Sequence, residues 1–155
     1  MEASIKPIVS QDGNMGRDVS NLDEPVLANI REHWDWVREG IVEALATDPQ
    51  TGVMPEDVFA ACVSNQAHLW ISEDGFLVTM GTTETYSNER VLLLWIGWAK
   101  ERGRNLAVAH QPFFEKQAKD AGFSALEFRT TVKEVGQYAE AANWTRRETV
   151  YTSKV

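Results

Sequence analysis

The stretch RVLLLWIGWAKERGRNLA, residues 90–107, decides the fold class. Residues 90–98 are apolar at nearly every position, which is typical of a strand that is buried on both faces at the centre of a sheet. A charged loop, residues 100–105, follows this run directly. The stretch therefore predicts a layered α/β domain, in which helices cover both faces of a sheet that contains residues 90–98.

Two further strands are expected immediately before this run, because residues 68–72 and 76–83 have the alternating pattern of β-structure. Glu73-Asp74-Gly75 lies between them, and an Asp-Gly pair suits the positive φ angles of a tight hairpin turn. A second turn at Tyr86–Glu89 connects to the apolar run. The three strands together predict an antiparallel meander.

Helices and further strands are expected on both sides of the meander. Apolar residues recur at three- and four-residue steps over residues 25–46, and Pro55 opens a second helix through about Asn65. After the meander the patterns predict, in order, a helix over 111–121 closed by Gly122, a strand over 125–129, a helix over 132–142 and a strand over 147–153. Residues 1–24 are polar and irregular, so we expect an extended N-terminal arm on a domain formed by residues 25–155.

Composition narrows the class of protein. The chain has 155 residues, a net charge of −8 and a pI of about 4.9, which argues against a nucleic-acid partner because phosphate binding needs a basic surface. Cys62 is the one cysteine and lies in an apolar run, so we expect a buried structural thiol and a reducing compartment. The sequence shows no signal peptide and no transmembrane stretch, which predicts a soluble protein without membrane partners, made in the cytoplasm.

The loop after the apolar run carries a recognisable motif. Arg102, Gly103, Arg104, Asn105 and Ala107 resemble the Arg/Gln-x-x-Gly-x-Gly/Ala loop of the GNAT acyl-CoA N-acetyltransferases, and the order of elements over residues 26–155 is similar to the GNAT fold. In that family the loop amides and the dipole of the following helix hold the pyrophosphate of the cofactor. The resemblance implies a central mixed β-sheet flanked by helices, with acetyl-CoA as the cofactor of an active member.

Two residues depart from the family motif. Asn105 stands where the middle glycine is expected, and its side chain occupies space that a phosphate needs. Pro112 lies inside the expected phosphate-binding helix, and proline is best tolerated in a first helical turn. We therefore expect the helix to begin at Gln111 or Pro112, some residues beyond Arg102, so that residues 102–112 form no anion site backed by an aligned helix.

The resemblance also suggests the remaining parts of an acetyltransferase site. The backbone of Trp95, Ile96 and Gly97 would contact the thioester arm, and Glu84 would act as a base through water. The family acid is a tyrosine that corresponds to Ala139, and Tyr138 lies one residue away, turned by about 100° around a helix. Glu84 and Tyr138 are therefore the candidate catalytic residues, with a solvated surface carboxylate as the alternative for Glu84.

A branch of this fold encoded by tailed bacteriophages is similar over three short motifs: Leu69-Trp70, Pro112 to Ala118, and Asn143-Trp144. This resemblance implies a protein that has lost acetyl transfer and serves as a structural or accessory component of the virion. Its partners would be other virion or phage proteins, reached through residues 1–24. Trp34 and Trp36 lie two residues apart and cannot share a helix face, so one of them is a candidate exposed interface anchor.

Other readings remain open at the level of sequence. The chain could be an active acyl-CoA N-acetyltransferase or an inhibitor of a host protein. The basic residues Lys100, Arg102 and Arg104 could bind CoA phosphates, face solvent or contact an acidic neighbour. No two of His33, His68 and His110 have the spacing of metal ligands on one helix face, so no metal site is expected.

Overall fold

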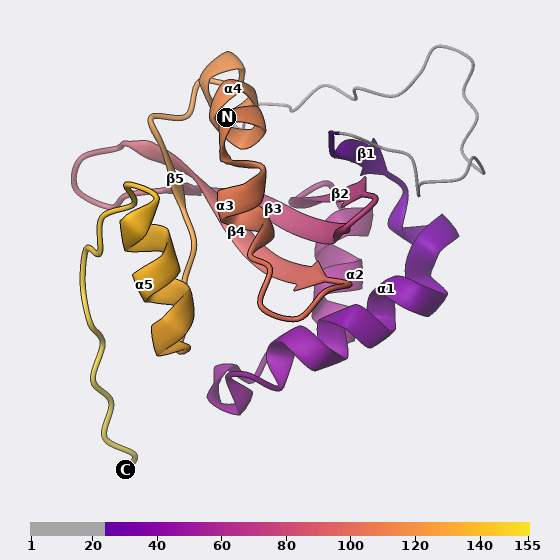
Figure 1. Ribbon diagram of the computed structural model, residues 1–155, viewed down its shortest axis with the longest axis horizontal. Helices are drawn as coiled ribbons and strands as arrows, with labels where there is room; N and C mark the ends of the chain where they lie inside the picture. The colour runs from indigo at the N-terminus through magenta and orange to yellow at the C-terminus, as the bar shows by residue number, and fades with distance from the viewer. Residues whose placement is uncertain (1–23) are drawn as a thin grey trace.

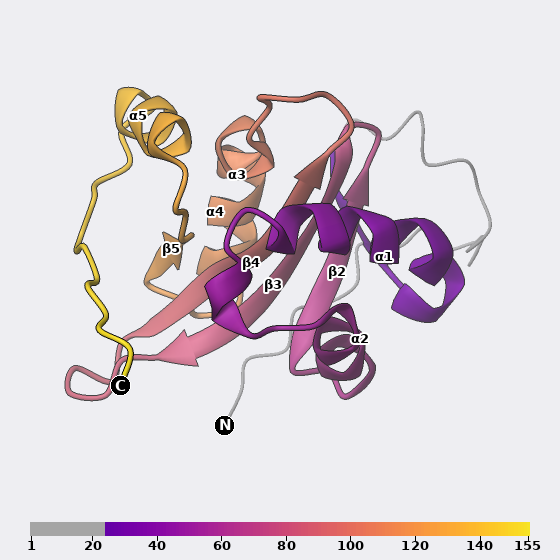
Figure 2. The same ribbon diagram turned by 90° about the horizontal axis from the view of Figure 1, so that it is seen from below.

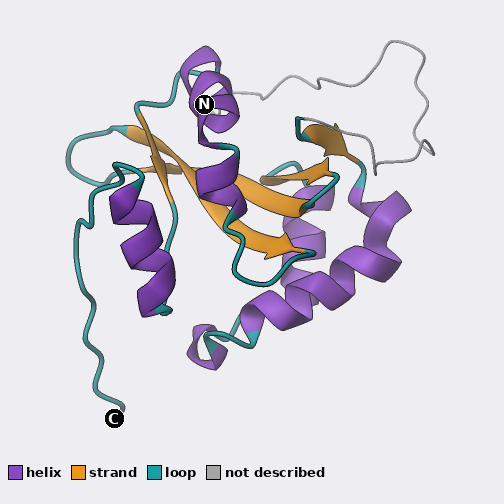
Figure 3. Cartoon of the chain, viewed as in Figure 1, coloured by secondary structure: helices purple, strands orange, loops and turns teal. Residues whose placement is uncertain are grey.

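The computed structural model describes residues 24–155, so the predicted arm lies outside the described residues apart from Glu24. The elements in chain order (Figures 1 and 3) are β1 (Val26–Ala28), α1 (Ile30–Leu45), the 3-10 helix η2 (Pro49–Thr51), α2 (Pro55–Val63), β2 (Ala67–Ser72), β3 (Gly75–Thr83), β4 (Arg90–Ala99), α3 (Leu106–Ala109), α4 (Gln111–Asp120), β5 (Ala125–Glu127) and α5 (Lys133–Ala141). Within residues 24–155, no helix is both long and apolar enough to cross a membrane.

The sheet has five strands in the order β1-β2-β3-β4-β5. Neighbouring strands run antiparallel except β4 and β5, which are parallel. Figure 2 shows α1 and α2 on one face of the sheet and α3 and α4 on the other. The prediction of a mixed sheet flanked by helices is confirmed, and the four consecutive buried residues Val91–Leu94 show that β4 is covered on both faces. The middle position, expected for residues 90–98, belongs to β3, with β4 beside it.

Each face of the sheet has its own hydrophobic core. On the α1 and α2 face, Val37, Ile41 and Val58 pack with strand residues such as Phe76. On the α3 and α4 face, Trp70 and Phe114 are fully buried, and the Trp70 Nε1 donates a hydrogen bond of 2.9 Å to Thr79 Oγ1. The predicted hairpin turn is confirmed at Gly75, which has φ of +149° and approaches Trp98 so closely that a Cβ atom would lie 2.0 Å from the Trp98 carbonyl oxygen.

The first predicted helix starts later than the apolar periodicity indicates. Val26, expected on the helical face, belongs to β1 and is paired with Ile71 of β2. Asn29 then starts the helix, because its Oδ1 accepts a hydrogen bond of 3.0 Å from the Arg31 amide. Backbone pairing with β2, which the sequence does not reveal, outweighs the helical pattern at residues 26–28.

The predicted strand over residues 147–153 is wrong. The chain there is exposed, and Figure 3 draws it as a loop that leads to the C-terminus. Within the described residues this segment pairs with no strand, since β5 is the last strand of the sheet. A strand is stable only with a neighbour to receive its backbone hydrogen bonds, so β-forming residues alone do not produce one.

Candidate functional site

β4 and β5 diverge at the point where β4 is irregular. Their pairing covers Val91 to Leu93, whereas β4 continues to Ala99. On the other side of β4, the register with β3 skips Trp95, because Val78 is paired with Ile96 and Thr79 with Leu94. The bulge and the divergence leave backbone groups of residues 95–97 without a strand partner on the β5 side. These are the residues that the sequence assigned to the thioester arm.

The helix after the basic loop begins earlier than expected. α3 starts at Leu106, directly after the loop, and α4 follows it end on end after His110 (Figures 1 and 2). Pro112 lies in the first turn of α4, as predicted, and Gly122 ends α4 with φ of +85°. The expectation that no helix starts near Arg102 is therefore wrong, because α3 was missed: it has four residues, too few to show a helical period.

Asn105 itself caps α3. Its Oδ1 accepts hydrogen bonds from the Ala107 amide at 2.9 Å and from the Val108 amide at 3.3 Å. Amides at this position of a helix are the donors that hold a phosphate oxygen in an anion site. The side-chain oxygen of Asn105 therefore occupies the place where such an oxygen would bind, and a glycine at this position would leave both amides free.

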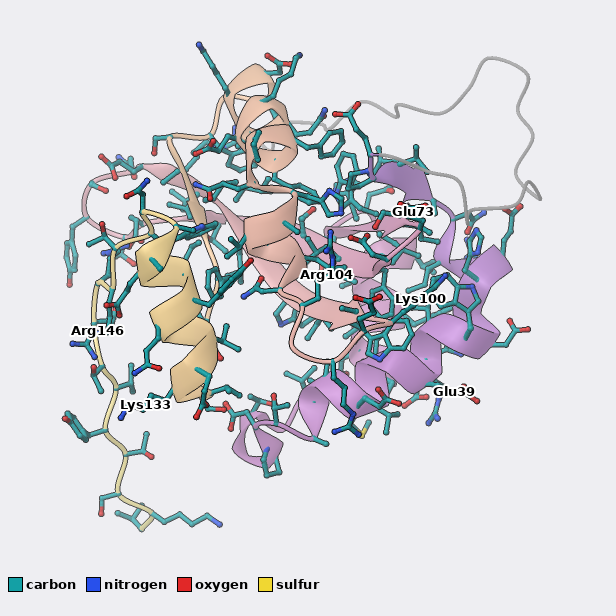
Figure 4. The ribbon with its side chains drawn as sticks, in the orientation of Figure 1. Glu39, Glu73, Lys100, Arg104, Lys133 and Arg146 are labelled. Carbon is teal, nitrogen blue, oxygen red and sulfur yellow. The ribbon has the colours of Figure 1, made fainter. Side chains whose placement is uncertain are left out.

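Arg104 differs from the other two basic residues of the loop in forming an ion pair with a described residue. Arg104 donates from Nε to Asp74 Oδ2 at 2.8 Å, so its guanidinium forms an ion pair with the β2–β3 turn. Lys100 and Arg102 are exposed, and neither forms an ion pair with another described residue. Figure 4 shows Lys100 and Arg104 on the loop between β4 and α3. Gly103 has φ of +82° and an open position, which makes it a turn residue of this loop.

Asp74 connects the β2–β3 turn to the basic loop and to the junction of α3 and α4. It accepts hydrogen bonds from Ser72 Oγ and Arg104 Nε and lies 3.1 Å from His110 Nε2, at the junction of α3 and α4. Burial alone raises the pKa of Asp74, but the bonds from Ser72, His110 and Arg104 outweigh it and lower that pKa to about 2. No sequence pattern links Asp74 to His110, and the prediction treated Asp74 only as a turn residue.

Glu84 lies apart from the bulge, and Tyr138 lies on an exposed side of α5. Glu84 follows β3 in the hairpin, where its amide bonds Glu89 O at 2.8 Å and its carboxylate accepts from Arg147 at 3.1 Å. At about 3.3 Å per residue, the strand from Glu89 to Trp95 spans about 20 Å. Tyr138 is 54% exposed on α5, whereas Ala139 beside it is buried, as the 100° offset predicts. Catalytic roles for Glu84 and Tyr138 remain predictions.

Trp34 and Trp36 lie on opposite sides of α1, and both are partly covered by the protein itself. The Trp34 ring contacts Phe59 of α2 edge-on at 4.8 Å, and Trp36 contacts Phe76 and Trp98 of the sheet. Neither is the exposed side chain that the interface role requires. The two rings lie on different sides of α1, as their spacing predicts. The side that carries Trp34 faces α2, however, and not solvent.

The partly buried thiol of Cys62 and the acidic side chains of the described residues offer no second site. Burial raises the pKa of Cys62 to about 12, so it is protonated and unreactive at neutral pH. Among residues 24–155, no group of three or more His, Cys, Asp or Glu side chains is arranged to hold a metal ion. The β4 bulge and the α3 N-terminus therefore form the candidate site of the described chain.

Comparison with models of protein families gave no match, and neither did comparison with curated protein sequences. Solved structures do match. A probable acetyltransferase is 18% identical with a TM-score of 0.61, over 85% of this chain and 97% of that one. Ribosomal-protein-alanine N-acetyltransferase from Brucella melitensis biovar Abortus 2308 is 13% identical with a TM-score of 0.61, over 85% and 99%. A putative acetyl transferase from Pyrococcus furiosus is 15% identical with a TM-score of 0.61, over 85% and 100%. The chain therefore has the fold of the GNAT acetyltransferases.

Proposed function

We propose that this GNAT-fold chain has lost acetyl transfer and serves as a structural or accessory protein in the assembly of a phage virion. One observation carries the loss of activity: Asn105 Oδ1 bonds the amides of Ala107 and Val108, which a cofactor phosphate would need. This contact supports the proposal that the loop does not fit the diphosphate of acetyl-CoA.

Two costs oppose cofactor binding at this loop. Displacing a helix-capping side chain costs about 1 kcal/mol, and freeing Arg104 from Asp74 costs up to about 1 kcal/mol at a partly exposed site. Their sum lowers cofactor affinity about thirtyfold. Asp74 also keeps its negative charge at neutral pH, since its pKa is about 2, and it lies within hydrogen-bond distance of the loop guanidinium. The β2–β3 turn thus presents a carboxylate beside the loop guanidinium that a diphosphate would need.

The virion role rests on the resemblance to the phage branch of this fold and on residues 1–24 as the contact to other virion proteins. The test is quantitative mass spectrometry of purified particles. A virion component is expected at a constant copy number per particle. Absence from particles would contradict this part of the proposal, and copurification with a single host protein would instead favour an inhibitor.

The loss of cofactor binding is tested by calorimetric titration of the full chain with acetyl-CoA. We expect no measurable heat of binding for the native chain. Asn105→Gly should gain affinity about fivefold, because it removes the cost of about 1 kcal/mol for displacing the cap and frees both amides. Asn105→Ser is the matched control: serine also caps helices, so this variant should gain nothing. Tight binding by the native chain would contradict the proposal.

A working acetyl-CoA-dependent N-acetyltransferase is the second candidate, and one observation favours it. The divergence of β4 and β5 together with the bulge at Trp95 exposes backbone groups that could receive a thioester arm. The corresponding test measures release of free thiol from acetyl-CoA in the presence of a panel of amines. Turnover above the uncatalysed rate would replace the first proposal by this one.

A further inference from the structure

The negative charge of the described chain is concentrated in one layer. Residues 30–63, from the start of α1 to the end of α2, contain seven acids and two arginines, a net charge of −5. The other described residues contain twelve acids and eleven bases, a net charge of −1. The layer on the α1 and α2 face of the sheet therefore attracts cations, while the rest of the described chain is nearly neutral. The charged residues of this layer are Glu32, Asp35, Glu39, Glu43, Asp48, Glu56, Asp57, Arg31 and Arg38.

Four of these acids form a row along the exposed side of α1. They are three or four residues apart, so they lie one above another on one side of the helix, and all four are exposed. None of them forms an ion pair with another described residue. Like charges at four-residue spacing repel one another, which costs about 0.2–0.5 kcal/mol per pair, and a bound cation would offset that repulsion. The acidic row consists of Glu32, Asp35, Glu39, which points outward from α1 in Figure 4, and Glu43.

The last carboxylate of the row is bonded to the sheet. Glu43 Oε2 accepts a hydrogen bond of 2.7 Å from Trp98 Nε1, near the end of β4. The indole is neutral, so this bond positions the carboxylate without neutralising its charge. A carboxylate positioned in this way loses less side-chain entropy when a cation binds to it.

Exposed apolar side chains lie beside the acidic row. Val42 is 46% exposed and lies on α1 one turn beyond Arg38. Arg38 Nε pairs with Glu56 Oε2 at 3.0 Å, which joins this side of α1 to the first turn of α2. Met54, two residues before Glu56, is 56% exposed. Figure 2 shows no other described element over the side of α1 that is turned away from the sheet, so this face of the helix has no partner within the described chain.

Charge complementarity selects the occupant of this surface. A second copy of the chain would bring a further net charge of −8, and residues 1–23 bring four acids against two bases. Nucleic acids and anionic membranes are repelled by an acidic surface as well. A protein segment rich in lysine and arginine fits both features, because its cations face the acidic row and its alkyl stems cover exposed apolar side chains.

We propose that the exposed side of α1, together with Met54, binds a lysine- and arginine-rich segment of a partner protein. The acidic row pairs with the cations of the segment, and Val42 and Met54 provide the apolar contact. This surface lies on the opposite face of the sheet from α3 and the loop at Asn105 (Figure 2), so its function is independent of whether acetyl-CoA binds. It is also separate from residues 1–24, on which the proposed virion contacts rest.

The test measures binding of a fluorescein-labelled peptide of lysine and leucine to the full chain by fluorescence anisotropy. A second peptide, with glutamate in place of every lysine, is the reference probe. We expect the lysine peptide to bind, with an affinity that falls as the salt concentration rises, and the glutamate peptide not to bind.

Charge reversal on α1 is compared with charge reversal on α5. Asp35→Lys with Glu39→Lys should weaken binding of the lysine peptide about tenfold, because attraction becomes repulsion at two positions. Glu134→Lys with Glu140→Lys is the matched control: it changes the net charge equally, at exposed positions of α5, and should leave the affinity unchanged. Circular dichroism of both variants should match that of the native chain.

Val42→Gln tests the apolar contact without changing any charge. Glutamine is a good helix former, so α1 is retained. The variant loses the burial of a half-exposed valine against the peptide, which should weaken binding about threefold.

Four outcomes would overturn the proposal. Absence of binding by the lysine peptide at low salt excludes the surface. Equal weakening by the α1 and α5 double variants would assign the binding to net charge alone. Spermine that binds as tightly as the peptide would show a site for a small polycation instead of a protein segment. A dimer in light scattering that dissociates in Val42→Gln would assign the surface to a second copy of the chain.

Discussion

The described chain up to α4 and the chain from β5 onward differ in how much they bury. In β3, residues 75–79 are all buried, and β4 contributes the buried run Val91–Leu94. In β5 no residue is buried, and α5 buries only Ala139. The stability of the fold is therefore concentrated in β2, β3 and β4 and in the helices that cover them, while β5, α5 and the C-terminal segment open at lower cost.

The candidate site lies at the boundary between these regions. The bulge at Trp95 belongs to the well-packed sheet, whereas the divergence beside it exists because β5 is short and ends at Glu127. A rigid strand next to a weakly held neighbour is an arrangement that can accept a ligand or another strand without disrupting the core. The departures of residues 102–107 from the GNAT motif therefore lie outside the part of the chain that holds the fold together.

The largest expected effect comes from comparing one tryptophan from each region. Trp70→Ala removes a fully buried ring and leaves Thr79 Oγ1 without its donor, so it should lower the free energy of unfolding by about 3–5 kcal/mol. Trp144→Ala, in the partly exposed region, should cost only about 1–2 kcal/mol. Denaturant unfolding of both variants measures the difference, and equal losses would show that the two regions contribute equally to stability.

A glycine pair tests the same contrast through packing. In Gly40→Ala the new Cβ would lie 2.6 Å from Phe76 and 2.9 Å from Trp98, and overpacking of this kind costs about 1–3 kcal/mol. Gly136→Ala on α5 meets nothing within 4 Å, so its better helix propensity should raise stability by about 0.5–1 kcal/mol. Thermal unfolding shows whether each variant is less stable or more stable than the native chain. A gain in stability for Gly40→Ala would mean that α1 can move away from the sheet.

A smaller loss of stability, which depends on pH, is expected at Asp74, which connects the sheet to α3 and α4. Its pKa of about 2 is below that of an unfolded chain, so its charge stabilises the fold above about pH 4, and this contribution is lost as the pH falls toward 2. Asp74→Asn should therefore lower stability by about 1–2 kcal/mol at pH 7 and by little at pH 2. Unfolding curves of both proteins across this range provide the measurement. A deficit that does not change with pH would assign the effect to packing instead of charge.

The sheet meander was predictable because its signals are local. The apolar run of residues 90–98, the Asp-Gly turn before Gly75 and the alternation in residues 68–72 each depend on neighbours in the chain. The ends of α4 and α5 were predictable for the same reason. Gly122 and Asn143 take positive φ at these ends, with φ of +85° and +71°.

The remaining features depend on residues far apart in the chain. β1 forms because it pairs with β2, and residues 147–153 form no strand because they pair with none of the described strands. α3 is too short for a periodic signal, and it begins where Asn105 caps it. Asp74 became part of the candidate site only through contacts with Arg104 and His110, which follow it by 30 and 36 residues.

The sequence by itself determined the class of fold, the meander and the position of the basic loop, because hydrophobic period and turn chemistry act over a few residues. Only the tertiary structure decided that Asn105 accepts hydrogen bonds from the first amides of α3 and that Asp74 pairs with Arg104. It also decided that β4 and β5 diverge beyond Leu93. Each of these three features depends on which backbone donors and charged groups from separate segments pair with one another. Those pairs form only when the segments have packed together.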